Sequence, residues 1–147
     1  MENRQISFFL PPAPHAVADA RHRVLAQLQG WGLQPGSGVL DSVELATSEL
    51  VTNAVQHASS GCEPVAVDVR LVDGLVRIAV CDTDRRLPRL RYPGSMEENG
   101  RGLVIVAAMA VRFEAEPTPT GKRCWAEFEV PATSVDARPA TVQRVDR

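Results

Sequence analysis

The chain has 147 residues, of which 44% are hydrophobic and 23% are charged, and its formal net charge is -2. This length and apolar content suit one ordinary domain, and the near balance of charge gives no general attraction to nucleic acid or to an anionic membrane. No apolar run approaches the roughly 20 residues of a membrane-spanning helix, and the apolar stretch 6–12 is too short for a secretory signal. We therefore expect a cytoplasmic protein that binds neither nucleic acid nor membrane directly.

The N-terminal part of the sequence predicts a strand and two helices. Residues Ile6 to Leu10 form a short apolar stretch that can add an edge strand. Apolar residues recur at helical spacing from His15 to Leu28. After a loop over 33–40, Asp41 is expected to cap a second helix over 42–57, whose broad apolar stripe can pack against a sheet.

A hairpin and a long loop follow. Apolar residues alternate along Val65 to Leu71 and again along Leu75 to Asp82, and the dipeptide Asp73-Gly74 predicts a tight turn between these two strands. Residues 84–100 are polar and contain proline. Loops of this length in compact domains are usually lids or binding loops.

A short helix and a second hairpin complete the predicted domain. The helix is expected over 102–110, and the hairpin over 111–116 and 122–130. Residues 131–147 have little apolar content and are expected to be a disordered tail, so residues 1–130 would form one domain. The order of elements predicts an α+β fold, namely a two-layer α/β sandwich with one mixed sheet and helices on one face.

Three polar residues recur every four positions along the second helix. Glu49, Asn53 and His57 therefore share one face of a helix that is otherwise apolar. They can form a solvated face, or a buried polar network that fixes the helix. They can equally form a magnesium–nucleotide site, in which Asn53 supplies an oxygen ligand to the metal and Glu49 orients or deprotonates the attacking hydroxyl or water.

Asp82 ends the strand that begins at Leu75. Asp82 lies an even number of positions from Val76, Ile78 and Val80. Alternate residues of a strand share one face, so its carboxylate is expected on the buried face of the sheet. A buried carboxylate needs a hydrogen-bond donor, and the exocyclic amine of adenine is one such donor. The alternative is an aspartate that caps the turn after the strand.

Glycines flank the start of the helix expected over 102–110. Gly100 and Gly102 stand on either side of Arg101 and precede Leu103. They would let the backbone approach a phosphate, which the free N–H groups of the first helical turn would bind. Glycines also serve ordinary turns from loop to helix, and the sequence contains neither a dinucleotide-binding fingerprint nor a P-loop.

These three motifs occur in one chain and in order, and together they resemble the GHKL ATPase superfamily with its Bergerat-type sandwich. The segment Glu49 to His57 resembles the N-box of that superfamily, Asp82 resembles the aspartate of its first glycine box, and 100–103 resembles its second glycine box. The small stand-alone branch is the most similar. It comprises bacterial anti-sigma-factor serine/threonine kinases and related ATP-binding regulators, and phrases such as Gly121-Lys-Arg-Cys-Trp-Ala-Glu127 are typical of it. The resemblance covers roughly residues 14–130.

The resemblance implies a role for each motif residue and two cofactors, ATP and Mg²⁺. It implies that Asn53 holds the magnesium ion, that Glu49 is the general base and that Asp82 recognises adenine. It assigns the phosphates to Gly100, Arg101, Gly102 and Leu103. His57 matches a motif position, but we assign it no catalytic role.

Two functions are compatible with this resemblance. The first is a protein serine/threonine kinase that transfers the γ-phosphoryl group of ATP to a STAS-type anti-sigma-factor antagonist and also binds a sigma factor. The second is a non-catalytic regulator that binds partner proteins and binds ATP weakly or not at all. The second draws support from Asp82-Thr-Asp84-Arg-Arg86, because the superfamily usually has Asp-x-Gly-x-Gly there. Relatives are often homodimers, although the sequence identifies no interface.

Overall fold

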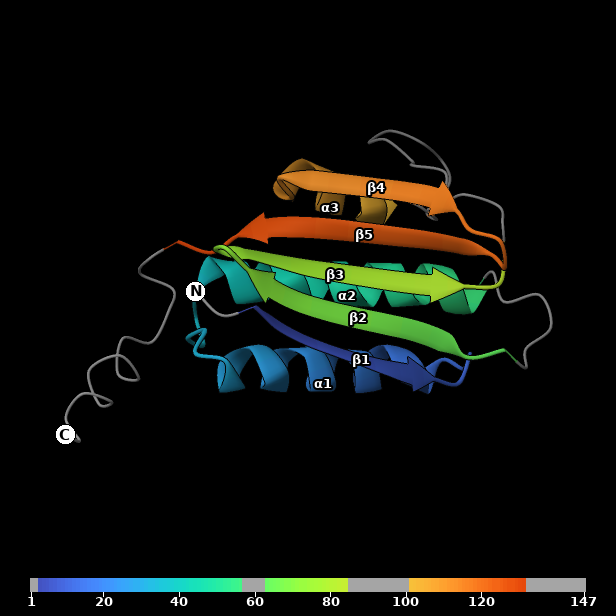
Figure 1. Ribbon diagram of the computed structural model, residues 1–147, viewed down its shortest axis with the longest axis horizontal. Helices are drawn as coiled ribbons and strands as arrows, with labels where there is room; N and C mark the ends of the chain where they lie inside the picture. Colours follow the sequence, from blue (N-terminus) through green and yellow to red (C-terminus); the bar gives the residue numbers. More distant parts are fainter. Residues whose placement is uncertain (1–2, 57–62, 85–100, 132–147) are drawn as a thin grey trace.

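The computed structural model describes residues 3–56, 63–84 and 101–131 of the chain. These residues form two layers, a five-stranded sheet and a layer of helices behind it (Figure 1). The elements, in chain order, are β1 (Arg4–Leu10), α1 (His15–Gly30), α2 (Gly38–Gln56), β2 (Val65–Val72), β3 (Leu75–Asp82), α3 (Arg101–Met109), β4 (Arg112–Pro117) and β5 (Lys122–Glu129).

The strands of the sheet lie in the order β1-β2-β3-β5-β4. The predicted α+β sandwich with helices on one face is confirmed, but the predicted mixed sheet is wrong, because all four described strand pairings are antiparallel. The chain does cross over from β3 through α3 to β4, and these two strands point the same way in Figure 1. They are not neighbours, because β5 folds back between them and pairs with both.

The three helices cover one face of the sheet, with α1 behind β1, α2 behind the central strands and α3 behind β4 and β5 (Figure 1). The central helix, α2, contacts both other helices and the strands β2, β3 and β5. Its predicted apolar stripe is confirmed, since Val43, Ala46, Leu50 and Ala54 are all buried. Because α2 packs against two helices and the sheet, its inward-facing side chains have fixed positions relative to the sheet. None of the described helices is long and apolar enough to cross a membrane.

The start of α2 differs from the prediction. The helix begins at Gly38, so Asp41 lies in its first turn and is not the N-cap. Val39 and Leu40 are both buried, and the burial of these two apolar side chains favours an earlier helix start within the segment expected to be a loop. A carboxylate in the first turn still interacts favourably with the helix dipole.

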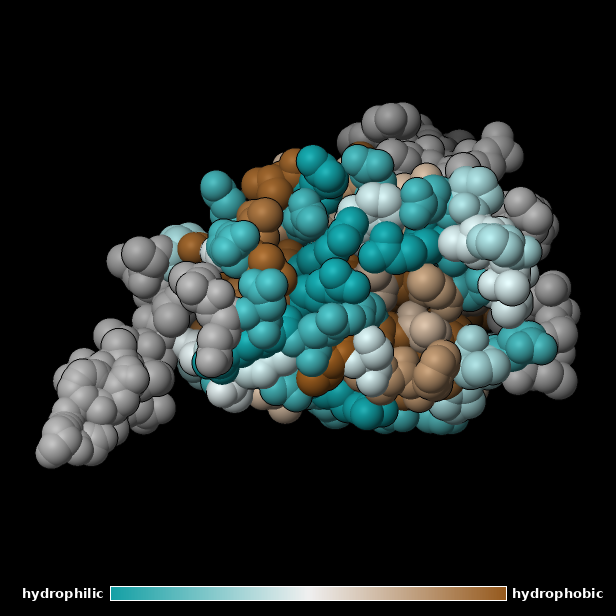
Figure 2. All heavy atoms as spheres, in the orientation of Figure 1, coloured by the Kyte–Doolittle hydropathy of each residue, from teal (hydrophilic) through white to brown (hydrophobic). Residues whose placement is uncertain are grey.

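The other face of the sheet carries no described helix and is hydrophilic across its centre (Figure 2). Here Asp68 on β2 accepts hydrogen bonds from Gln5 and Ser7 on β1. On β5 the ring of Trp125 has the guanidinium groups of Arg77 and Arg123 over it, at 4.8 and 4.7 Å. These contacts cover the indole, which is 6% exposed.

Candidate functional site

The predicted site residues come from elements that meet at one end of the sheet. Figure 1 shows the tip of β3, the start of β5 and the C-terminal part of α2 at this end. Asp82 is the last residue of β3, Lys122 is the first residue of β5, and these two residues are register partners. The fold therefore places the two predicted motifs of α2 and β3 at a common edge.

Glu49 on α2 lies directly against Gly102 in the first turn of α3. A Cβ atom built on Gly102 would overlap the carboxylate of Glu49 and would lie 2.7 Å from its Oε2 atom. Any side chain at position 102 would thus displace Glu49. The structure brings together the predicted base and one of the predicted phosphate-binding glycines, which are 53 positions apart in the sequence by subtraction of their numbers.

Burial raises the pKa of Glu49 above its ordinary value of 4.5. The cause is desolvation, which disfavours the charged form of a carboxyl group. A carboxylate with a raised pKa is a better proton acceptor than an ordinary glutamate, and this is the property that a general base near neutral pH needs.

The remaining predicted residues of α2 and α3 have different environments. Asn53 follows Glu49 by one turn and is half-buried. Leu103 is 3% exposed and packs in the hydrophobic core, so only its backbone N–H can face a ligand. Arg101 is the first residue of α3. Gly100 and His57 lie outside the described residues, as do residues 85–100 of the predicted loop and the tail from 132.

Asp82 is buried on the helix-covered face of the sheet, as its parity predicted. Its Oδ1 atom accepts a hydrogen bond of 2.8 Å from the backbone N–H of Asp84, so the aspartate does cap the turn after β3. The ammonium group of Lys122 lies 2.9 Å from Oδ2 and 3.1 Å from Oδ1. The donor that this buried carboxylate needs is therefore supplied, at least in part, by the chain itself.

Gly121 explains how Lys122 reaches this position. A Cβ atom on Gly121 would overlap the carbonyl oxygen of Asp82 and would lie 2.6 Å from the Cα atom of Thr83. Only a glycine lets the start of β5 pack this closely on the end of β3. The close approach delivers the side chain of Lys122, which is 0% exposed, to the carboxylate of Asp82.

The sequence placed Gly121 in the connection of the second hairpin and Lys122 at the start of its last strand, and it assigned neither residue a role in the site. Both residues stand in a phrase typical of the resembled branch, and that phrase was the available signal. Their function follows only from the register of β3 and β5, in which Lys122 lies opposite Asp82.

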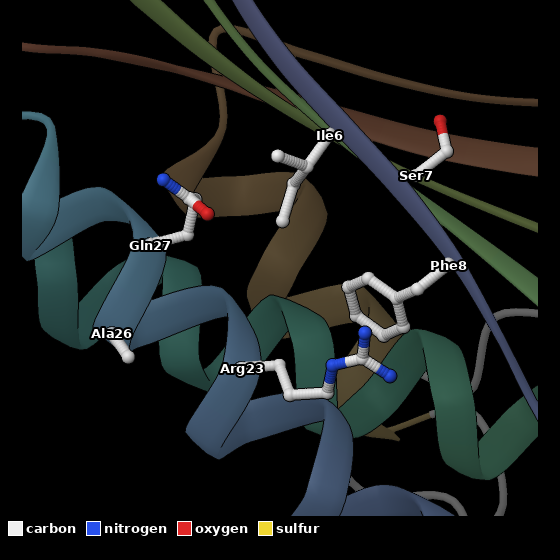
Figure 3. Close-up of a pocket in the computed structure, with 6 residues that line it drawn as sticks. All are labelled: Ile6, Ser7, Phe8, Arg23, Ala26 and Gln27. Carbon is white, nitrogen blue, oxygen red and sulfur yellow. The ribbon is translucent and has the colours of Figure 1, made fainter.

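A separate groove of about 430 Å³ lies between β1 and α1 (Figure 3). Figure 3 shows its lining residues, among them Ile6, Gln27 and the pair Phe8 and Arg23, whose guanidinium lies 4.0 Å from the ring centroid. The groove contains none of the predicted site residues. The candidate site is thus the edge formed by α2, β3, α3 and β5.

The protein is thus an α+β sandwich in which acidic side chains and the N-terminus of α3 lie at one end of the sheet. Residues 10–128 match the family model of the histidine kinase-like ATPase domain. The chain therefore belongs to the family of histidine kinase-like ATPase domains, and this membership implies that it binds ATP. The matched residues extend from the last residue of β1 nearly to the end of β5, so they include every element of the site.

A solved structure has a similar fold. It contains the RsbU and RsbW domains of Rv1364c from Mycobacterium tuberculosis, and the TM-score is 0.62 at 20% sequence identity. The alignment covers 86% of this chain and 32% of that chain, so the chain spans about a third of the length of its structural relative. No curated protein matches the sequence.

Proposed function

We propose that this protein is a cytoplasmic, magnesium-dependent ATP-binding regulator that phosphorylates a serine or threonine of a STAS-type anti-sigma-factor antagonist and also binds a sigma factor. The observation that carries the proposal is the contact between Glu49 and Gly102, because it joins a candidate base to a candidate phosphate-binding backbone. Family membership supports ATP as the ligand. The resemblance of the motifs to anti-sigma-factor kinases supports the choice of partner.

The residues at the start of α3 fit a chain of phosphates. The first N–H groups of a helix have no partner within the helix and carry partial positive charge. A side chain at position 102 would displace the carboxylate of Glu49, and with Gly102 in place a ligand there meets bare backbone. Asn53 offers its amide oxygen one turn further along α2, and an oxygen of this type suits magnesium shared with phosphates.

In this proposal, each of the site residues carries one part of the phosphoryl transfer. Bound ATP would supply the γ-phosphoryl group, whose bond to the β,γ-bridging oxygen breaks so that ADP leaves. The carboxylate of Glu49 accepts the proton of the partner's serine or threonine hydroxyl as that oxygen attacks. The N–H groups of Gly102 and Leu103 donate hydrogen bonds to the phosphate oxygens. Asp82 accepts a hydrogen bond from the amine of adenine.

A second candidate function is a regulator that binds its partners without catalysis. The favouring observation is Asp84, which occupies the position of a superfamily glycine and is 7% exposed. Its backbone carbonyl accepts a hydrogen bond from Lys122 at 3.3 Å. The side chain of Asp84 thus stands where the resembled superfamily has bare backbone, and this reduces the space for a nucleotide.

Two measurements test the kinase. Calorimetric titration with ATP and Mg²⁺ establishes nucleotide binding, and transfer of labelled phosphate to a purified STAS-domain antagonist establishes turnover. Glu49→Gln should still bind ATP, since the phosphates do not need the carboxylate, and should lose transfer by roughly a hundredfold. Glu44→Gln is the matched control, because Glu44 is an exposed carboxylate on the same helix, and it should transfer phosphate as the wild type does.

The outcomes separate the two functions. If wild type and Glu49→Gln bind the antagonist but neither transfers phosphate, the proposal of a kinase is wrong and the proposal of a non-catalytic regulator is supported. If both transfer phosphate equally, Glu49 is not the base. If the wild type shows no magnesium-dependent ATP binding at all, the proposed site itself is wrong.

A further inference from the structure

The pair formed by Lys122 and Asp82 is the most buried charged contact among the described residues. The side chain of Lys122 is 0% exposed and that of Asp82 is 5% exposed. The ammonium group contacts both carboxylate oxygens, at 2.9 and 3.1 Å. Its third described contact is the backbone carbonyl of Asp84 at 3.3 Å. The ammonium group thus donates hydrogen bonds to Oδ1 and to this carbonyl and forms an ion pair with Oδ2.

The pair leaves Asp82 with little freedom. A carboxylate offers about four acceptor positions. On Oδ1, one is used by the N–H of Asp84 and one by Lys122. The Oδ2 atom lies 2.9 Å from the same ammonium group. These contacts restrain both carboxylate oxygens, and Oδ2 keeps acceptor capacity for a ligand.

We propose that Lys122 is a positioning residue that gives this site its preference for adenine. Its ammonium group pairs with the buried carboxylate of Asp82 and holds the Oδ2 atom in one place. A charged carboxylate can accept a hydrogen bond from the exocyclic amine of adenine and repels the carbonyl oxygen that guanine carries at the same place. This inference rests on the proposed function, because it assumes that Asp82 faces the base.

The pair could instead serve only to hold β3 against β5. Such a tie would stabilise the domain, since removal of one partner from a buried ion pair leaves an uncompensated charge. A purely structural tie, however, would affect every nucleotide equally. The ratio of the dissociation constants for ATP and GTP therefore distinguishes the two roles.

The experiment compares magnesium-dependent binding of ATP and GTP by calorimetry. The wild type should bind ATP about tenfold or more tightly than GTP, the usual value of a hydrogen bond to a charged group. Lys122→Met should keep nucleotide binding and lose this preference. Asp82→Asn should lose it as well, and the double variant should show no further loss, because the two residues act through one hydrogen bond. Arg123→Met is the matched control, since Arg123 is the next cation along β5 and contacts the ring of Trp125, and it should keep the wild-type ratio.

Each outcome decides the proposal. An unchanged ratio in folded Lys122→Met would overturn the role of Lys122 and leave the proposed function standing. Equal binding of ATP and GTP by the wild type would overturn it as well. If the wild type binds neither nucleotide, the proposed function falls and this inference falls with it. Should Lys122→Met fail to fold, Lys122→Gln keeps a donor for Asp82 without the charge, and an undiminished preference in that variant would overturn the proposal.

Discussion

Glu49 is held in an environment that disfavours its charge. Burial raises the pKa of this carboxyl group, so the folded protein binds a proton there more readily than the unfolded chain does. The stability gained in this way is complete below the unfolded pKa of 4.5 and is lost as the pH rises through the folded pKa. At neutral pH the wild type therefore carries a desolvated charge that it does not carry in acid.

We predict that Glu49→Gln raises the melting temperature at pH 7 and has no such effect near pH 4. The amide removes the desolvated charge, and at low pH the wild-type carboxyl group is already neutral. Thermal unfolding of both proteins at the two pH values measures the difference. A variant that is less stable at pH 7 would show that the N-terminus of α3 stabilises the Glu49 charge by more than burial disfavours it.

Asn53 shares the helix face of Glu49 and is half-buried. We predict that Asn53→Ala weakens magnesium-dependent ATP binding about tenfold or more while the fold stays intact, because the alanine removes the amide oxygen that would hold the ion. Calorimetry with and without Mg²⁺ measures this. Gln56→Ala removes an exposed amide from the same helix and should bind as the wild type does. Unchanged affinity in Asn53→Ala would refute the assignment.

At the scale of elements, the contact between β5 and the end of β3 depends on one glycine. Gly121 has no room for a Cβ atom, because the obstructing atoms belong to the backbone of Asp82 and Thr83 and cannot swing away. We predict that Gly121→Ala destabilises the protein by about 1–3 kcal/mol, the usual cost of overpacking. Urea unfolding measures the loss.

A second glycine provides the matched control. Gly30 ends α1, and a Cβ atom there would meet nothing closer than the amide nitrogen of Gln27 at 4.0 Å. Gly30→Ala should therefore stabilise the protein by about 0.5–1 kcal/mol, through the lower entropy of its unfolded chain. The same sign of effect in both variants would contradict our account of Gly121.

Elements with a simple burial period could be predicted from the sequence. The alternation along β3 correctly placed Asp82 on the buried face, and the stripe of α2 correctly placed Leu50 in the core. The antiparallel sheet and the partner of Asp82 could not be predicted, because they depend on which distant strands become neighbours. Lys122 follows Asp82 by 40 positions, and no local pattern reports a pairing across that distance. The predicted start of α2 was wrong because tertiary burial outweighed a local capping signal.

At the scale of the whole molecule, local and distant strand pairings differ in the chain entropy that they cost. The β2–β3 hairpin closes over Asp73 and Gly74, whose φ angles of 51 and 77° suit a tight turn. The β3–β5 pairing joins residues 40 or more positions apart, and the closure of such a loop is costly until other contacts compensate.

We predict that the hairpin forms before β5 docks. Gly74→Ala strains the left-handed turn and should mainly slow folding. Ala126→Gly weakens β5 at a residue that is 0% exposed and should mainly speed unfolding. Stopped-flow kinetics over a range of denaturant measures both rates. The reverse assignment would show that β5 belongs to the folding nucleus.

The contacts at the edge of the sheet also hold the two described chain ends on either side of residues 85–100. Asp84 is fastened by Asp82 and Lys122, and α3 begins where Gly102 rests on Glu49. Loop length alters closure entropy only slowly, by about 0.6 kcal/mol per doubling. The part of the connecting stretch that precedes Gly100, residues 85–99, is therefore a suitable place for the insertion of other sequences. A recognition sequence of different length could replace it while the sheet and its helices keep their arrangement. One scaffold could then present binding loops of many specificities.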